Sequence, residues 1–203
     1  MDNTAFYTLS YGLFVVGAAR EGKRNGMIGN TLLQATDNPP RVALTLNKAG
    51  LTHDMIAATG RFSASVLCRG ADFELFRQFG FRSGRGCDKF DGAYPFALDA
   101  QGLPYLTQYA NARFSCRVAQ SADLGSHTWF LADVLEAERL GSEPSITYAD
   151  YQSGIKPAAK PQPKSQTRRW QCKVCGYIHE GEDLPADFVC PWCKHGAMDF
   201  EEI

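Results

Sequence analysis

The sequence predicts a mainly β protein: an antiparallel barrel followed by a small metal-bound domain. Three observations predict it. Residues 1–151 contain short strand-like runs separated by turn signals, and these runs outnumber the helix-like ones. Residues 170–203 carry two C-x-x-C pairs. Residues 152–169 are rich in proline and lysine and almost free of apolar side chains, as in an extended linker. We therefore expect a body over 1–151, a linker over 152–169 and a metal module over 170–203.

Apolar and β-branched runs predict the elements of the body, and glycine, proline and asparagine mark their ends. Glu21–Gly26 is expected to form a hairpin turn with Asn25-Gly26 as its central dipeptide. Helices are expected over Leu51–Thr59, ending at Gly60, and over Ala71–Phe79, with a glycine-containing loop over Gly80–Gly92. The expected strands are a first one at the end of Ala5–Ala18, then Met27–Ala35, Arg41–Asn47, Arg61–Leu67, Ala112–Ala119 and Thr128–Leu140.

Composition limits the compartment and the partners. No run approaches the roughly 18 apolar residues that span a bilayer, so we expect no membrane partner. The N-terminal residues lack the basic and apolar regions of a secretory signal, which makes the cytoplasm the expected location. Three cysteines, Cys68, Cys87 and Cys116, lie outside the two C-x-x-C pairs, and an odd number argues against a secreted disulfide framework. Cys116 is expected to be a buried strand residue, and Cys87 a free loop thiol.

Charge is distributed unevenly along the chain. Residues 1–151 hold 14 basic and 15 acidic residues, the linker holds five basic residues and no acid, and residues 170–203 hold two basic and seven acidic residues. A nucleic-acid binder would carry positive charge on its folded module, so this pattern excludes that class. An acidic module on a basic linker suits electrostatic docking with a basic partner protein, although a merely solvated surface gives the same pattern.

The four cysteines Cys172, Cys175, Cys190 and Cys193 predict one tetrahedral metal site. Each C-x-x-C pair can present both sulfurs to one point, and the 14 residues between the pairs let them meet. Gly176 follows the first pair, where positive φ lets backbone N–H groups turn toward the sulfurs. The segment is also dense in aromatic residues, which favours a redox iron centre over structural zinc because a packed shell limits water. Zinc binds the same four thiolates well, so recombinant protein could carry zinc in place of iron.

The module resembles a short rubredoxin, and the likeness covers the whole segment. It is carried by Trp170-x-Cys172-x-x-Cys175-Gly-Tyr177, Leu184-Pro-x-Asp-Phe188-x-Cys190-Pro-x-Cys193 and Asp199-Phe200-Glu201. The resemblance implies a single Fe(SCys)4 centre that carries one electron. Lys194 departs from the family pattern, which has glycine after the last cysteine, and we expect either a strained backbone there or altered hydrogen bonding to Cys193.

The body resembles the flavin reductase-like, FMN-binding split-barrel family. The matching stretches are Leu9–Val16, Asn25–Thr31, Gln34–Pro40, Leu46–His53, Phe81–Phe90 and Gly125–Thr128. Together with the C-terminal module, the likeness extends to fusions called high-molecular-weight rubredoxins. The resemblance implies FMN as cofactor, NAD(P)H as electron donor and a homodimer.

The resemblance also implies roles for individual residues. His127 and Asn30 would be catalytic, positioning the nicotinamide and the flavin. The residues that would contact the cofactor are Asn30, Thr31, Gln34, Thr36, Asn47, Lys48, Thr52, Lys89, His127 and Tyr151, the last from a partner subunit. Amides and hydroxyls suit the flavin ring, and cations suit the FMN phosphate. Each residue also has a structural interpretation; Thr52, for example, could cap the helix that follows it.

The function implied is an electron-transfer oxidoreductase in which NAD(P)H reduces FMN and single electrons pass to the rubredoxin iron. The acceptor implied by the resemblance is a flavodiiron-type oxygen or nitric oxide reductase. Three alternatives stay open: a free-flavin reductase, an electron-transfer adaptor that never meets NADH, and a zinc-stabilised interaction module on a silent barrel.

Overall fold

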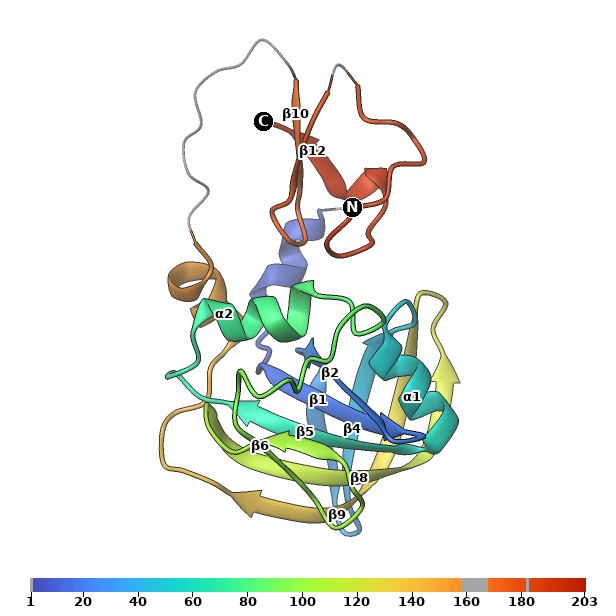
Figure 1. The fold of residues 1–203 in the computed structure, drawn as a ribbon, viewed down its shortest axis with the longest axis vertical. Coiled ribbons are helices and arrows are strands. Elements are labelled where there is room, and N and C mark those ends of the chain that lie inside the picture. Colours follow the sequence, from blue (N-terminus) through green and yellow to red (C-terminus); the bar gives the residue numbers. More distant parts are fainter. Residues whose placement is uncertain (1, 158–167, 182) are drawn as a thin grey trace.

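The computed structural model describes residues 2–157, 168–181 and 183–203. Residues 158–167 of the predicted linker lie outside this range. A β-barrel body occupies one end of the molecule, and the small C-terminal module lies over it beside the N-terminal helical turn (Figure 1). The helical elements are η1 (Asn3–Thr8), α1 (Leu51–Thr59), α2 (Phe73–Phe76), η2 (Arg77–Phe81), α3 (Tyr148–Asp150), η3 (Tyr151–Ile155) and η4 (Ala197–Asp199).

A seven-stranded antiparallel sheet forms the barrel, in the order β2-β1-β5-β8-β9-β4-β3. Its strands are β1 (Phe14–Arg20), β2 (Lys23–Gly29), β3 (Leu32–Asp37), β4 (Pro40–Asn47), β5 (Arg61–Leu67), β8 (Ala110–Asp123) and β9 (His127–Arg139). The two edge strands, β2 and β3, are consecutive in the chain, so the barrel is split between them. A short hairpin of β6 (Phe96–Leu98) and β7 (Pro104–Leu106) lies beside the sheet, and the sequence patterns did not predict it.

The two faces of the sheet bury separate apolar cores, as the period-two alternation of β1 requires. Phe14, Val16 and Ala18 point into the barrel, where they pack with Phe62 and with Ile56 of α1. Leu13 and Val15 belong to a second core on the other face, with side chains from α2, η2 and η3. The second core therefore fixes the segment after β5, which borders the cavity described below.

Several predicted elements are confirmed. The helix over Leu51–Thr59 ends at Gly60, whose φ of 66° is the left-handed conformation that glycine adopts without cost. The strand over Arg61–Leu67 has the predicted bounds, and Cys116 is fully buried in β8. The predicted helix over Ala71–Phe79 is shorter and changes at Arg77 into a π-helical turn.

The predicted hairpin turn at Asn25-Gly26 is wrong. Glu21 and Gly22 form the turn, both with positive φ, and Asn25 and Gly26 lie inside β2, paired with Ala18 and Gly17 of β1. The single strand predicted over Met27–Ala35 is also wrong, because the chain leaves β2 after Gly29 and starts β3 at Leu32. The pairing decides this break, because β2 pairs with β1 and β3 pairs with β4 at opposite edges of the sheet, and local propensity does not encode it.

The C-terminal module is a three-stranded antiparallel sheet with β10 (Arg169–Cys172) between β11 (Ile178–Glu180) and β12 (Phe200–Glu202). Its small core consists of the cysteines together with Phe200, Trp170, Tyr177, Leu184 and Phe188. Phe81 of the body packs against this same core. Among the described residues no helix is long and apolar enough to cross a membrane.

Candidate active site and metal centre

The four predicted metal ligands converge on one point. The Sγ atoms of Cys172, Cys175, Cys190 and Cys193 all lie within 4.8 Å of one another, and two of the S–S separations are 3.5 Å. A tetrahedral ion with metal–sulfur bonds of about 2.3 Å places its sulfurs roughly 3.8 Å apart. The donor set and its spacing therefore fit one tetrahedral ion that prefers four thiolates, either iron or zinc.

The two C-x-x-C pairs have the same backbone geometry. The N–H of Gly176 donates to the carbonyl oxygen of Cys172 at 2.8 Å, and the N–H of Lys194 donates to that of Cys190 at 2.9 Å. Gly176 has a φ of 78° and Lys194 a φ of 64°, so both turns close through the left-handed region. The expected strained backbone at Lys194 is confirmed, and the second turn accepts that strain to match the first.

Without a metal the clustered thiols share their protons. The hydrogen bond with Cys175 lowers the pKa of Cys193 and raises the pKa of Cys175. A hydrogen bond with Cys193 likewise raises the pKa of His195, whose Nδ1 lies 3.2 Å from the Cys193 carbonyl oxygen. A bound cation would take the place of these protons, since metal ligands must be deprotonated.

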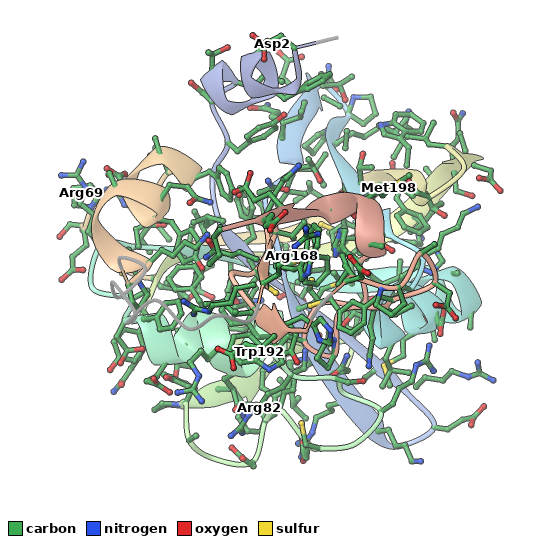
Figure 2. The ribbon with its side chains drawn as sticks, turned by 90° about the horizontal axis from the view of Figure 1, so that it is seen from above. Asp2, Arg69, Arg82, Arg168, Trp192 and Met198 are labelled. Carbon is green, nitrogen blue, oxygen red and sulfur yellow. The ribbon has the colours of Figure 1, made fainter. Side chains whose placement is uncertain are left out.

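A cavity of about 240 Å³ lies between the body and the module. The body lines it with β2, the loop and first turn of α1, and the segment from Phe79 to Lys89. The module lines it with Val174, Cys175 and residues 192–195, so two of the four metal ligands face the same space. Figure 2 looks down on the module and labels Trp192 of the module and Arg82 of the body, both of which line the cavity.

The polar wall of the cavity is built from buried side chains. Asn25 donates through Nδ2 to Thr52 Oγ1 at 2.9 Å, and Asn25 is 2% and Thr52 0% exposed. Thr52 does not cap α1, because the N-cap is Gly50 and Thr52 lies inside the first turn. The Oδ1 atom of Asn25 has no hydrogen-bond partner among the described residues. Asn25, a residue of this wall, therefore carries a buried, unsatisfied acceptor beside a buried hydroxyl.

Lys89 brings a positive charge to the same wall. It is 4% exposed, and its Nζ donates to the carbonyl oxygens of Gly26 and Phe79, each at 3.0 Å. Burial lowers the pKa of Lys89 from 10.5 to about 8, because desolvation disfavours the ammonium. The sequence could not show this burial, since Lys89 lies in a segment expected to be a loop.

Of the ten residues expected to contact the cofactor, the cavity brings together Asn47, Thr52 and Lys89. Asn47 Oδ1 accepts from the backbone N–H of Ala49, which shapes the turn into α1. Asn30 and Thr31 lie at the split between β2 and β3, where Thr31 donates to the Thr45 carbonyl oxygen at 2.6 Å.

The other five predicted cofactor contacts lie outside the lining of this cavity. Lys48 forms an ion pair with Asp123, and His127 Nδ1 lies 2.8 Å from Ser126 Oγ. Gln34 and Thr36 are exposed on β3 beside a different, apolar hollow. Tyr151 is buried against Phe76, with ring centroids 4.6 Å apart. Their roles toward a cofactor stay predictions.

Sequence reasoning missed two residues of this site. Asn25 was assigned to a turn, although it stands in one of the stretches that match the split-barrel family. Phe81 stands at the start of a stretch that resembles the split-barrel family. Nothing local in the sequence distinguishes a phenylalanine that contacts another domain from one that fills a core. Both follow only from how β2 and η2 are placed under the module.

Comparison with known proteins identifies the two parts. The flavin reductase like domain family matches residues 6–159, and the rubrerythrin, rubredoxin-like domain family matches residues 170–201. A high molecular weight rubredoxin from Moorella thermoacetica is 36% identical over the whole of both chains. This chain belongs to the high-molecular-weight rubredoxin family. As a member of it, the protein is an oxidoreductase with a flavin reductase-like body and an iron-binding rubredoxin-like module.

Two further relatives of this family member cover about three quarters of the chain or slightly less. A ferric-chelate reductase (NAD(P)H) from Archaeoglobus fulgidus is 38% identical over 74% of this chain and 89% of its own. The NADH:FAD oxidoreductase SgcE6 of Streptomyces globisporus has a solved structure with a TM-score of 0.64 and 26% identity, covering 70% of this chain and 84% of that one. The shared body is thus a mainly β flavin reductase-like fold.

The cavity residues fit a flavin chemically. A flavin ring carries an N–H donor and carbonyl acceptors, and its phosphate carries negative charge. The cavity offers the free Asn25 acceptor, the Thr52 hydroxyl and the Lys89 ammonium, with Met27, Leu51 and Phe79 as apolar surface. Mostly apolar walls with a few converging polar groups are the usual composition of a cofactor site.

Proposed function

We propose that this protein is an NAD(P)H-dependent oxidoreductase that passes electrons from FMN in the cavity to an Fe(SCys)4 centre in its own module. When bound, FMN would take two electrons from NAD(P)H as hydride and release them singly, and the iron would carry one at a time. The proposal rests on one observation: the cavity is lined by polar groups of the body on one side and by Cys175 and Cys193 on the other.

The residues of the body would bind and orient the cofactor. Lys89 supplies fixed positive charge, and its two backbone hydrogen bonds hold the ammonium in place. Thr52, already accepting from Asn25, keeps its own hydroxyl proton for a ligand acceptor. We retain Asn30 and His127 as the residues that position the ring and the nicotinamide, together with the remaining predicted contacts.

The module side of the cavity would exclude water and shorten the path to the metal. Trp192 and Val174 cover the opening next to the cysteines, and Phe81 packs against the module core from the body. Because the metal ligands face the body in this arrangement, the module must leave it to present the same face to another protein. The acidic module would then suit a basic acceptor surface, such as that of a flavodiiron-type reductase.

We further propose a homodimer, as the family resemblance implies. An apolar hollow beside the edge strand β3, lined by Leu33, Val42, Phe114 and Val134, gives a second copy a surface to cover. Leu33 is 60% exposed in the single chain, and a second copy that covers this hollow would bury it.

Anaerobic stopped-flow absorbance on iron-loaded, FMN-loaded protein tests the proposal. After NADH or NADPH is added, the flavin band should bleach first and the iron–thiolate bands second, at a rate independent of protein concentration. Loss of flavin on gel filtration would favour the free-flavin reductase. Absence of bleaching with either nucleotide would favour the adaptor, and a colourless module with stoichiometric zinc after growth in iron would favour the interaction module.

A further inference from the structure

The Oδ1 atom of Asn25 is a buried polar atom of the body that lacks a hydrogen-bond partner among the described residues. Asn25 is 2% exposed in the middle of β2. A buried acceptor left without a donor is costly, so native proteins rarely retain one unless something else satisfies it. Asn25 also lines the cavity between body and module.

Two neighbours hold this amide in one orientation. Its Nδ2 is committed to Thr52 Oγ1 at 2.9 Å, which leaves the other end of the amide as the free one. On that side, a Cβ built on Gly84 would overlap the Asn25 side chain, so the absence of a side chain at position 84 is what makes room for the amide. Gly84 lines the cavity as well. The amide is therefore held in one orientation, with its buried, unsatisfied Oδ1 next to Gly84 at the cavity wall.

We propose that Asn25 orients the flavin by accepting a hydrogen bond from N3–H of its isoalloxazine ring. This inference rests on the proposed function, because it assigns a residue to the flavin that the function requires. N3–H is the one N–H of the oxidised ring system, and the cavity wall otherwise offers donors in Lys89 and Thr52. The acceptor of Asn25 and those donors together match the alternating carbonyl, N–H and carbonyl edge of the ring.

The test is a thermodynamic cycle on flavin binding with the full-length, metal-loaded protein stripped of flavin. Wild type and Asn25→Ala are each titrated with FMN and with N3-methyl-FMN, following flavin fluorescence. We expect Asn25→Ala to weaken FMN binding about tenfold, the value of one lost hydrogen bond. We expect N3-methylation to weaken binding to wild type about as much, and to weaken binding to Asn25→Ala little further. Asn111→Ala is the matched control, because Asn111 bonds Glu143 and Ser145 far from the cavity.

Gly84→Ala provides a second, independent perturbation. It displaces the Asn25 amide without removing it, so it should weaken FMN binding in the same direction and add little to Asn25→Ala. Equal N3-methyl penalties in wild type and Asn25→Ala would overturn the inference, as would unchanged FMN affinity with only a lowered melting temperature. Failure of the wild type to bind FMN at all would refute the proposed function first, which separates the two failures.

Discussion

The buried ammonium of Lys89 predicts a specific pH dependence of stability. The side chain is 4% exposed, and desolvation lowers its pKa from 10.5 to about 8 in the folded protein. Below pH 8 both the folded and the unfolded chain hold the proton, and above 10.5 neither does. Between these values the unfolded chain binds one proton more, so the stability of wild type rises with pH.

The size of the effect follows from the interval. Each pH unit over which the proton numbers differ by one is worth about 1.4 kcal/mol. The interval from about 8 to 10.5 therefore contributes roughly 3 kcal/mol to the unfolding free energy of wild type. Lys89→Met lacks the titrating group, so its unfolding free energy should not gain this increment.

Urea denaturation between pH 7 and 10.5 measures the difference, followed by circular dichroism on flavin-free, metal-loaded protein. The difference in unfolding free energy between wild type and Lys89→Met should be constant up to pH 8. Above pH 8 it should shift by about 3 kcal/mol in favour of wild type. Lys23→Met, which removes an exposed lysine from β2, is the matched control. A gap between wild type and Lys89→Met that stays constant to pH 10.5 would refute the reasoning.

Three further predictions concern the module, its contact with the body, and the barrel core. Cys190→Ser should abolish the iron–thiolate absorption while NAD(P)H still bleaches the flavin; loss of both signals would mean that the body depends on the module to fold. Phe81→Ser removes the body side chain that packs on the module core, so flavin-to-iron transfer should slow about tenfold or more in stopped flow, by a larger factor than flavin reduction, since Phe81 also lines the cavity; an unaltered transfer rate would argue against this docking. Phe62→Ala empties a fully buried site in the barrel and should cost about 3–5 kcal/mol in urea denaturation, and a loss below 1 kcal/mol would contradict the packing described.

The orientation of the module implies that it would contact the body and an external acceptor at different times. The loops that carry Cys175 and Cys193 face the cavity, so the metal cannot face the body and an external acceptor through the same loops at once. Under the proposed function, electron entry and electron exit would then be separate events. The basic linker and the acidic module give the protein the sequence features for such alternation.

Much of the metal centre could be predicted from the sequence because its determinants are local. Each C-x-x-C pair closes a turn of a few residues, and the positive φ of Gly176 and Lys194 belongs to those same turns. The bounds of α1 and β5 were likewise set by short-range signals, a glycine at the helix end and a short run of apolar and small residues. The division into body, linker and module is a prediction from composition and charge alone.

The cavity could not be predicted in the same way, because it is made by segments that only the barrel brings together. Asn25-Gly26 has the composition of a hairpin turn, yet pairing with Ala18 and Gly17 places both residues inside β2. That register buries the Asn25 amide against Thr52 of α1, and the packing of η2 brings Lys89 to the same wall. The sequence by itself determined the kind of protein and its metal ligands. Only the tertiary structure decided which polar groups share a cavity with those ligands, because contacts between segments far apart in the chain, not local preference, set that proximity.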